Sequence, residues 1–296
     1  MAKILDGRAL AKEILAEVAG GVVEMQQKHE VTPGLAAVLV GDDPASAIYV
    51  RNKRRACGEA AMFSETFLLP ASTSQSEILD RVEQLNHDDR FHGILVQLPL
   101  PDQIDEEAII ESVRPDKDVD GIHPFNIGKL VQGRPDFIPG TPAGIQQLLL
   151  RNGYDPAGKN VVICGRSNIV GRPLAILLMQ RKAGANATVT VCHTRTKNLS
   201  DFTRQADILV AAMGRPKAIT ADMVKEGAVV IDVGINRVED ASRKQGYRLV
   251  GDVDFDPVSK KVEAITPVPG GVGPMTIAML LVNTLAAARI SIHGHS

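Results

Sequence analysis

Short apolar runs alternate with segments of helical period in the first hundred residues. The apolar runs are LAAVLVG (35–41), ETFLLP (65–70) and GILVQLPL (93–100), and helices are predicted between them at 46–60 and 75–88. This strand and helix order is typical of a parallel sheet that helices cover on both faces. Ser74 and Glu77 have the spacing of a capping box at the start of the second helix. The pattern therefore predicts an open α/β domain.

The same alternation returns after a passage rich in Pro, Gly and Asp, from PLPDQ to PGTP, which indicates a domain boundary. A helix is predicted at 142–152, followed by the strands NVVICG, ATVTVC, DILVAAM and GAVVIDVG and a short strand near 262–265. PMTIAMLLVNTLAAARI predicts a long, buried final helix. We expect an α/β protein with two open parallel-sheet domains around a cleft. The second domain is Rossmann-like, and the C-terminal helix returns to the first.

Composition and charge narrow the class of protein. The chain has 296 residues, 44% of them hydrophobic, enough for two domains with real cores. Its 33 basic and 35 acidic residues are mixed along the sequence, so no broad field attracts nucleic acid or a membrane. Three widely spaced cysteines argue against a disulfide framework and a zinc site. No signal peptide is recognised, and the stretch IAMLLVNTLAAA is short for a bilayer, so we expect a cytoplasmic protein.

A glycine turn between a buried strand and a helix predicts a dinucleotide site in VVICGRSNIVGRPLAILLM (161–179). The usual G-x-G-x-x-G pattern would place glycines at 165, 167 and 170. Here Ser167 and Val170 take two of those positions, and Gly171 comes one residue late. A glycine turn alone is weak evidence for a nucleotide.

The end of the next strand favours NADP over NAD. NAD enzymes commonly have an acidic residue there, whereas this chain has His193, Thr194 and Arg195. With Arg166 in the turn, these hydroxyl and guanidinium groups are suited to a 2′-phosphate. The alternative is a solvated strand end with incidental polar residues.

Candidate chemistry in the first half begins with Tyr49 and Lys53, which share one face if the segment is helical. Lys53 also opens a KRR cluster, and an ordinary wet helix face is the alternative. Gln97 ends a buried strand and needs hydrogen-bond partners, which are either the lysine amine or backbone groups.

The Asp-rich turn PDKDVDG resembles the start of a calcium loop, but its twelfth position is Ile127 and not glutamate. Asp120 is then either part of a plain turn or a carboxylate that binds a nitrogen heterocycle. His123 is a candidate general base or a structural loop histidine. TPVPGGVGPMT precedes a helix and is either a close-approach ligand loop or a hinge.

Together, YVRNK, VQLPLP, DKDVDG, GRSNIVGRP, DVGINR and PVPGGVGPMT closely resemble the bifunctional methylenetetrahydrofolate dehydrogenase/methenyltetrahydrofolate cyclohydrolase family. The resemblance implies NADP-dependent oxidation of 5,10-methylenetetrahydrofolate and hydrolysis of the methenyl product to 10-formyltetrahydrofolate. It also implies a homodimer, a folate-binding catalytic domain at 1–139 with helix 274–296, and an NADP-binding domain at 140–273.

The resemblance also implies roles for particular residues. Lys53 would be the acid/base of the hydrolytic step, with Gln97 orienting it, Tyr49 positioning folate and Asp120 binding the pterin. Further folate contacts would be Val96, Leu98, Pro269, Gly270, Gly271, Val272 and Gly273. NADP contacts would be Gly165, Arg166, Ser167, Ile169, Thr194, Arg195 and Ile235, and no metal is expected. Thr194 and Arg195 depart from the serine and lysine common in the family, but they keep the hydroxyl and the charge.

Three other functions remain open at this point. The chain could be a dehydrogenase without useful cyclohydrolase activity, another two-domain NADP oxidoreductase such as a shikimate dehydrogenase-like enzyme, or a catalytically idle NADP sensor.

Overall fold

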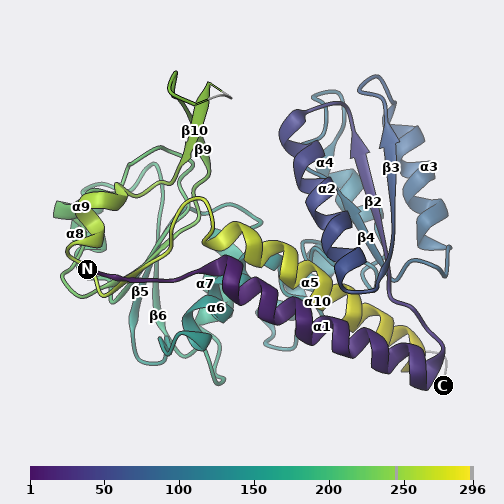
Figure 1. Cartoon of the computed structure of the whole chain (residues 1–296), viewed down its shortest axis with the longest axis horizontal. Coiled ribbons are helices and arrows are strands. Elements are labelled where there is room, and N and C mark those ends of the chain that lie inside the picture. Colours follow the sequence, from purple (N-terminus) through teal and green to yellow (C-terminus); the bar gives the residue numbers. More distant parts are fainter. Residues whose placement is uncertain (244–245, 294–296) are drawn as a thin grey trace. The chain divides into compact units, whose positions relative to one another are not determined.

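The computed structural model describes residues 1–243 and 246–293 and divides into two compact units. Unit 1 comprises Met1–Ala11 and Thr141–Thr276, and unit 2 comprises Lys12–Gly140 and Ile277–Ser296. The division falls within two long helices, α1 (Gly7–His29) and α10 (Val272–His293), which therefore contribute to both units (Figure 1). The last three residues of the helix expected at 274–296 lie outside the described residues.

Unit 2 contains a three-stranded parallel sheet in the order β3-β2-β4. Its strands are β2 (Gly34–Val40), β3 (Phe63–Leu69) and β4 (Gly93–Val96), joined through α2 (Pro44–Glu59) and α3 (Gln75–Asn86). These are the elements that the alternating pattern predicts. Every residue of β2 and β4 is buried, whereas β3, one of the two edge strands, is partly exposed. The third strand is shorter than expected, because the chain leaves the sheet after Val96.

Side-chain contacts define how the helices of unit 2 begin and pack. The capping box is confirmed: the Ser74 amide donates to the Glu77 carboxylate at 2.8 Å, and the Glu77 amide donates to the Ser74 hydroxyl. The passage expected to be loops also contains α4 (Glu106–Ser112) and α5 (Pro124–Val131), which are too short to give a clear helical period. Within unit 2, α1 and α10 pack closely, since a Cβ on Gly21 would lie 2.6 Å from Leu285.

Unit 1 contains a six-stranded sheet in the order β1-β11-β8-β7-β5-β6, in which every adjacent pair is parallel. The strands are β1 (Lys3–Ile4), β5 (Asn160–Cys164), β6 (Thr188–Cys192), β7 (Ile208–Ala211), β8 (Val229–Asp232) and β11 (Ala264–Ile265). Strand order reverses between β5 and β7, which is where doubly wound sheets bind dinucleotides. The Rossmann-like prediction is confirmed for this unit.

Connections in unit 1 are mostly short helices. They are α6 (Gly140–Arg151), α7 (Gly171–Leu178), α8 (Leu199–Thr203), the 3-10 helix η1 (Ala221–Met223) and α9 (Phe255–Ser259). An antiparallel pair, β9 (Asn236–Glu239) and β10 (Tyr247–Val250), was not expected. Neither was β1, because two residues are too few for a recognisable pattern.

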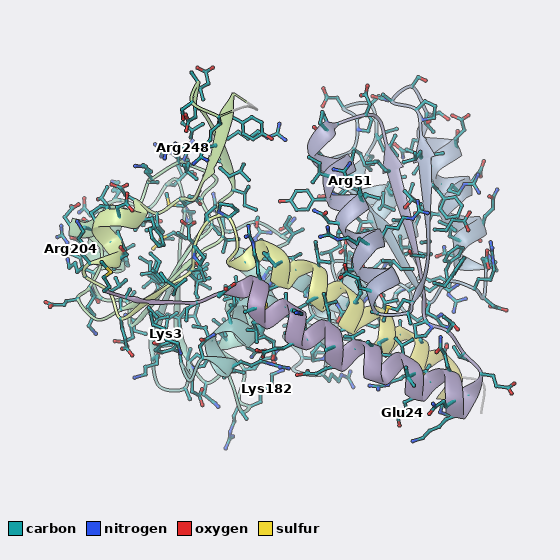
Figure 2. The ribbon with its side chains drawn as sticks, in the orientation of Figure 1. Lys3, Glu24, Arg51, Lys182, Arg204 and Arg248 are labelled. Carbon is teal, nitrogen blue, oxygen red and sulfur yellow. The ribbon has the colours of Figure 1, made fainter. Side chains whose placement is uncertain are left out.

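Charged side chains are spread over the surfaces of both units, for example Arg204 and Arg248 on unit 1 and Glu24 and Arg51 on unit 2 (Figure 2). Helix α10 is longer than its oily stretch suggests, and Val272–Ile292 is long and apolar enough by composition to cross a membrane. However, 56% of that helix window is buried in the structure, as expected of a core helix.

Candidate active site

Lys53 and Gln97 form a direct pair in unit 2. The Lys53 ammonium lies 3.0 Å from Gln97 Oε1, and the side-chain amide of Gln97 donates to the Leu98 carbonyl at 2.7 Å. Helix α2 carries Lys53, and Gln97 directly follows β4, so the carboxyl end of the sheet meets the helix face. Lys53 is only 8% exposed, whereas its neighbours Arg54 and Arg55 are exposed. The wet-face interpretation is therefore wrong for Lys53 and holds for the two arginines.

Burial and a nearby carboxylate act on the pKa of Lys53 in opposite directions. Burial lowers the pKa of Lys53, and the negative charge of Asp120 opposes this shift. Burial in turn raises the pKa of the Asp120 carboxyl to about 6, against the attraction of Lys53. The two groups are thus close enough to interact through their charges. Tyr49 lies one turn before Lys53 on α2, as the four-residue spacing predicts.

Asp118 holds the Asp-rich turn together, a role that was not predicted from the sequence. Asp118 is 4% exposed and accepts hydrogen bonds from the His123 amide at 2.9 Å and from the Asn126 side chain at 2.8 Å. His123 itself caps α5, because its Nδ1 accepts the Phe125 N–H at 3.0 Å. The geometry favours the structural interpretation of His123. Asp118 thereby holds the turn that carries Asp120, whose carboxylate interacts with Lys53 through its charge.

Asn283 also supports the backbone beside Asp120, a role that the sequence indicated only indirectly. Its side chain is buried and donates to the Val119 carbonyl at 2.8 Å and the Ile138 carbonyl at 2.9 Å. An asparagine inside an apolar helix was visible in the sequence, but its partners lie 145 and 164 residues away. Helix α10 thereby fixes the backbone next to Asp120.

The packing of Gly165 and Gly171 in unit 1 explains the altered glycine spacing of the dinucleotide turn. Gly165 has φ +145°, and a Cβ there would lie 2.1 Å from the Ala212 carbonyl oxygen. A Cβ on Gly171 would lie 2.0 Å from the Gly165 carbonyl oxygen. Gly171 therefore allows the close packing of helix against strand that the third glycine of a dinucleotide site provides. The turn leads into the N-terminus of α7, where backbone N–H groups can bind a pyrophosphate, so its residues fit a dinucleotide.

The other predicted cofactor residues lie at the same edge of the unit 1 sheet. Arg166, Ser167 and Ile169 are exposed in the turn after β5, and Thr194 and Arg195 are exposed after β6. The turn at Thr194 is held by His193, whose amide donates to the Thr196 hydroxyl and whose Nδ1 accepts the Arg195 N–H. Ile235 follows β8 and is 46% exposed.

The loop Pro269–Gly273 also belongs to unit 1 and leads into α10. A Cβ on Gly7 would lie 1.8 Å from the Gly271 carbonyl oxygen, and the Arg8 amide donates to the Gly270 carbonyl at 3.1 Å. The loop thus packs tightly on the start of α1. Of the predicted site, unit 2 contains Tyr49, Lys53, Val96, Gln97, Leu98 and Asp120, and unit 1 contains the remaining residues.

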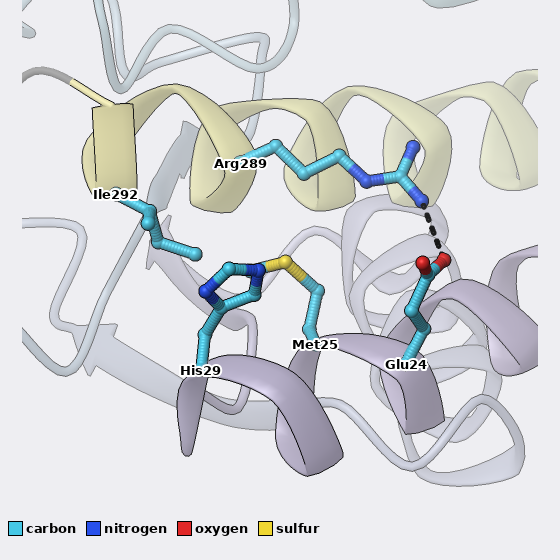
Figure 3. Close-up of a pocket in the computed structure, with 5 residues that line it drawn as sticks. All are labelled: Glu24, Met25, His29, Arg289 and Ile292. Carbon is cyan, nitrogen blue, oxygen red and sulfur yellow. Dashed lines mark ion pairs between the residues drawn. The ribbon is translucent and has the colours of Figure 1, made fainter.

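Two pockets on unit 2 are lined by none of the residues that we predict to bind folate or NADP. One, of about 280 Å³, lies where α1 and α10 meet, with Glu24 and Arg289 paired at 3.9 Å beside it (Figure 3). The other, of about 320 Å³, includes Lys117, whose ammonium already donates to the carbonyls of Leu85 and Asp88. Across residues 1–243 and 246–293, no group of acidic, His or Cys residues could hold a metal, and all three cysteines are free.

Known proteins match the chain in both halves. Residues 5–120 match the model described as the tetrahydrofolate dehydrogenase/cyclohydrolase catalytic domain, and residues 139–292 match that of the NAD(P)-binding domain. A relative from Salinibacter ruber, named bifunctional protein FolD, is 58% identical over 98% of this chain and 96% of its own length.

Two solved structures are similar throughout. The bifunctional enzyme FolD from Campylobacter jejuni has a TM-score of 0.92 and 49% identity, and covers 98% of this chain and 100% of its own. FolD from Trypanosoma brucei, solved with NADP and an inhibitor, has a TM-score of 0.93 and 40% identity, with 98% of each chain covered. From its fold, its two matched domains and its near full-length relatives, the chain belongs to the tetrahydrofolate dehydrogenase/cyclohydrolase family.

Proposed function

We propose that Lys53 is the acid/base group of a bifunctional folate enzyme and that Gln97 orients its amine. As a family member, the chain oxidises 5,10-methylenetetrahydrofolate with NADP and hydrolyses the methenyl product to 10-formyltetrahydrofolate. The observation that carries the proposed role is the buried 3.0 Å contact between Lys53 and Gln97.

The hydrolytic step needs a base beside a cationic substrate. Because burial lowers its pKa, Lys53 has a larger neutral fraction than a surface lysine, and a neutral amine is not repelled by the methenyl cation. The amine takes a proton from water as the water oxygen bonds to the one-carbon unit. The resulting ammonium then gives that proton to N5 of the folate as the bond between N5 and that carbon breaks, while the second proton of the water leaves to solvent and the formyl C=O forms. One residue serves as base and then as acid.

The other unit 2 residues have proposed roles in binding. Gln97 accepts a hydrogen bond from the amine and so holds it in one direction. Asp120 binds the pterin, and its raised pKa allows it to accept or donate a hydrogen bond near pH 6. Tyr49, Val96 and Leu98 contact the folate from α2 and the end of β4. The loop Pro269–Gly273 is proposed as a further folate contact.

The cofactor is NADP, and the residues proposed to hold it are those that surround the turn after β5. When bound, NADP supplies the acceptor for the hydride. Gly165, Ser167 and Ile169 hold the pyrophosphate through the turn, and Ile235 supports the nicotinamide half. Arg166, Thr194 and Arg195 hold the 2′-phosphate, since they offer positive charge and a hydroxyl without an opposing acid.

The roles of the two domains, the oligomeric state and the cellular location are also proposals. We assign folate binding and catalysis to 1–139 with the C-terminal helix, and NADP binding to 140–273. The matched family domains support the boundary near residue 139, and the grouping of Ile277–Ser296 with Lys12–Gly140 in unit 2 supports the placement of the C-terminal helix. A homodimer and a cytoplasmic location are proposed from the family resemblance and from the mixed surface charge.

An enzyme that performs only the dehydrogenase step is the remaining alternative, and Lys53→Met tests it. We expect the variant to lose at least about 100-fold in methenyl hydrolysis, the usual scale of acid/base catalysis, while its affinity for NADP stays within twofold. Hydrolysis is followed by the loss of methenyl absorbance without cofactor, and NADP affinity by calorimetry.

Arg54→Met is the matched control, because Arg54 is the next residue on α2 and is exposed. It should keep both activities. Normal hydrolysis by Lys53→Met would remove the lysine from the mechanism, and accumulation of methenylfolate by the unmodified protein would favour the dehydrogenase-only alternative.

A further inference from the structure

A second buried carboxylate, Asp252 in unit 1, organises the loop that follows β7. Asp252 is 0% exposed. Its Oδ2 accepts the amides of Met213 and Gly214, and its Oδ1 accepts the Arg215 amide at 3.0 Å and the Asn236 side chain at 2.9 Å. Three consecutive backbone N–H groups thus converge on one carboxylate. Such charge-assisted hydrogen bonds are among the strongest in proteins.

This loop lies beside the dinucleotide turn of the same sheet. The Ala212 amide donates to the Cys164 carbonyl at 2.8 Å, and the Ala212 carbonyl is the group that leaves no room for a side chain at Gly165. Strand order reverses between β5 and β7, so the loops after these strands border the ligand crevice. The 2′-phosphate residues follow β6, on one side of β5. With NADP held as proposed, its nicotinamide half would lie on the other side, over β7 and β8.

Another carboxylate of unit 1, Asp232, holds the backbone that carries Asp252. Its Oδ1 accepts the amides of Gly234 at 3.0 Å and Asp252 at 2.9 Å, and its Oδ2 accepts the Val253 amide at 3.0 Å. Both carboxylates are closely covered by glycines. A Cβ on Gly251 would lie 1.8 Å from Asp232 Oδ2, and one on Gly234 would lie 2.2 Å from Asp252 Oδ1.

The direction of the three amides determines what the loop presents to a ligand. In a trans peptide the carbonyl points opposite to the N–H of the next residue. With the amides of residues 213–215 turned to Asp252, the carbonyl oxygens of Ala212, Met213 and Gly214 point away from it. Carbonyl oxygens are the acceptors that a carboxamide NH₂ group needs.

We propose that Asp252 is a positioning residue for the nicotinamide half of NADP. It orients the carbonyls of residues 212–214 as acceptors for the carboxamide, and through Asn236 it fixes the backbone beside Ile235. This inference rests on the proposed placement of NADP in unit 1. It adds a residue that does not touch the cofactor and acts through the loop it holds.

Asp252→Asn in the full chain tests the inference, because asparagine keeps the shape but removes the charge and one acceptor. We expect kcat/KM for NADP in the dehydrogenase reaction to fall by about 10- to 100-fold, the scale of lost hydrogen bonds to a charged group. Affinity for adenosine 2′,5′-bisphosphate, which lacks the nicotinamide, should stay within twofold. Methenyl hydrolysis without cofactor should also be unchanged.

Other outcomes overturn the inference and leave the proposed function standing, provided that the unmodified protein has both activities. An equal loss of affinity for NADP and adenosine 2′,5′-bisphosphate would mean general damage to unit 1. An unchanged kcat/KM for NADP would mean that the loop needs no such anchor.

A second variant, Asn236→Ala, tests the proposal if Asp252→Asn does not fold. Asn236→Ala removes one of the four hydrogen-bond donors to Asp252 and should produce a smaller fall in kcat/KM for NADP. Affinity for adenosine 2′,5′-bisphosphate should again be kept. An unchanged kcat/KM for NADP would count against the proposal. Asp256→Asn, at an exposed position four residues on, is the matched control and should behave as the unmodified protein.

Discussion

The burial of Lys53 is the residue-scale fact on which the proposed chemistry depends. Three adjacent cations, Lys53, Arg54 and Arg55, differ sharply in exposure because helix α2 turns only the first toward the sheet. Arg55 instead pairs with Glu59 at 3.7 Å on the surface. Sequence reasoning could identify the cluster, but the exposure of each cation depends on how α2 packs.

The pH dependence of methenyl hydrolysis follows from Lys53 and Asp120. Because the neutral amine is the base, kcat should rise as pH rises through the pKa of Lys53, which burial lowers. Asp120 raises the pKa of Lys53, so Asp120→Asn should move this rising limb to lower pH. The difference should appear only above the Asp120 pKa of about 6, where its carboxyl is charged.

The measurement is kcat for hydrolysis against pH without cofactor, after subtraction of the uncatalysed rate. Asp116→Asn, which changes an exposed carboxylate paired with Arg114, is the control and should not move the limb. A limb that stays in place, or moves to higher pH, in Asp120→Asn would contradict the proposed coupling of the two charges.

Cofactor preference is also decided at single residues. Arg166→Ala should weaken NADP by about 10-fold and NAD by much less, because a guanidinium paired with phosphate contributes on the order of 1.5–3 kcal/mol and NAD has no 2′-phosphate. Dissociation constants for both dinucleotides provide the comparison. Equal losses for NADP and NAD would rule out a 2′-phosphate role for Arg166. Arg172→Ala is a suitable control, since Arg172 pairs with Asn168.

At the scale of elements, local signals predicted well what local contacts determine. The Ser74 and Glu77 capping box was identified from spacing alone because both residues lie within one helical turn. The pair β9 and β10 and the two-residue β1 were missed. The edge strand β1 is stabilised by pairing with β11, some 260 residues later.

Gly171, the first residue of α7, allows a test of how this helix packs against the dinucleotide turn. Gly171→Ala should weaken NADP binding strongly and destabilise unit 1, because the added Cβ would lie 2.0 Å from the Gly165 carbonyl, and overpacking of this kind costs about 1–3 kcal/mol. Gly20→Ala is the control, since nothing lies within 4 Å of its Cβ and alanine should stabilise helix α1 by about 0.5–1 kcal/mol.

Chemical denaturation and NADP titration of both variants would measure these effects. If Gly171→Ala binds NADP normally, the late glycine does not serve as the third glycine of the dinucleotide turn.

At the scale of the whole molecule, alternation of strands and helices correctly predicted two parallel sheets, and most of α10 belongs to unit 2, which contains the predicted first domain. Asn283 shows why this placement matters, because its two hydrogen bonds join α10 to the backbone beside Asp120. The loop-rich passage at 99–142 contains the two helices α4 and α5, and most of it belongs to unit 2. The predicted cleft between the domains stays a prediction.

Residue order was sufficient for the fold class, the parallel strands, the dinucleotide turn and the family, because period, glycine spacing and motif order are local properties of the chain. Folding was needed to reveal the buried state of Lys53, the support that Asp118 and Asn283 give to Asp120, and the two carboxylates beneath the loop after β7. Those features arise from desolvation and from hydrogen bonds between residues far apart in the sequence, and no short stretch of sequence encodes them.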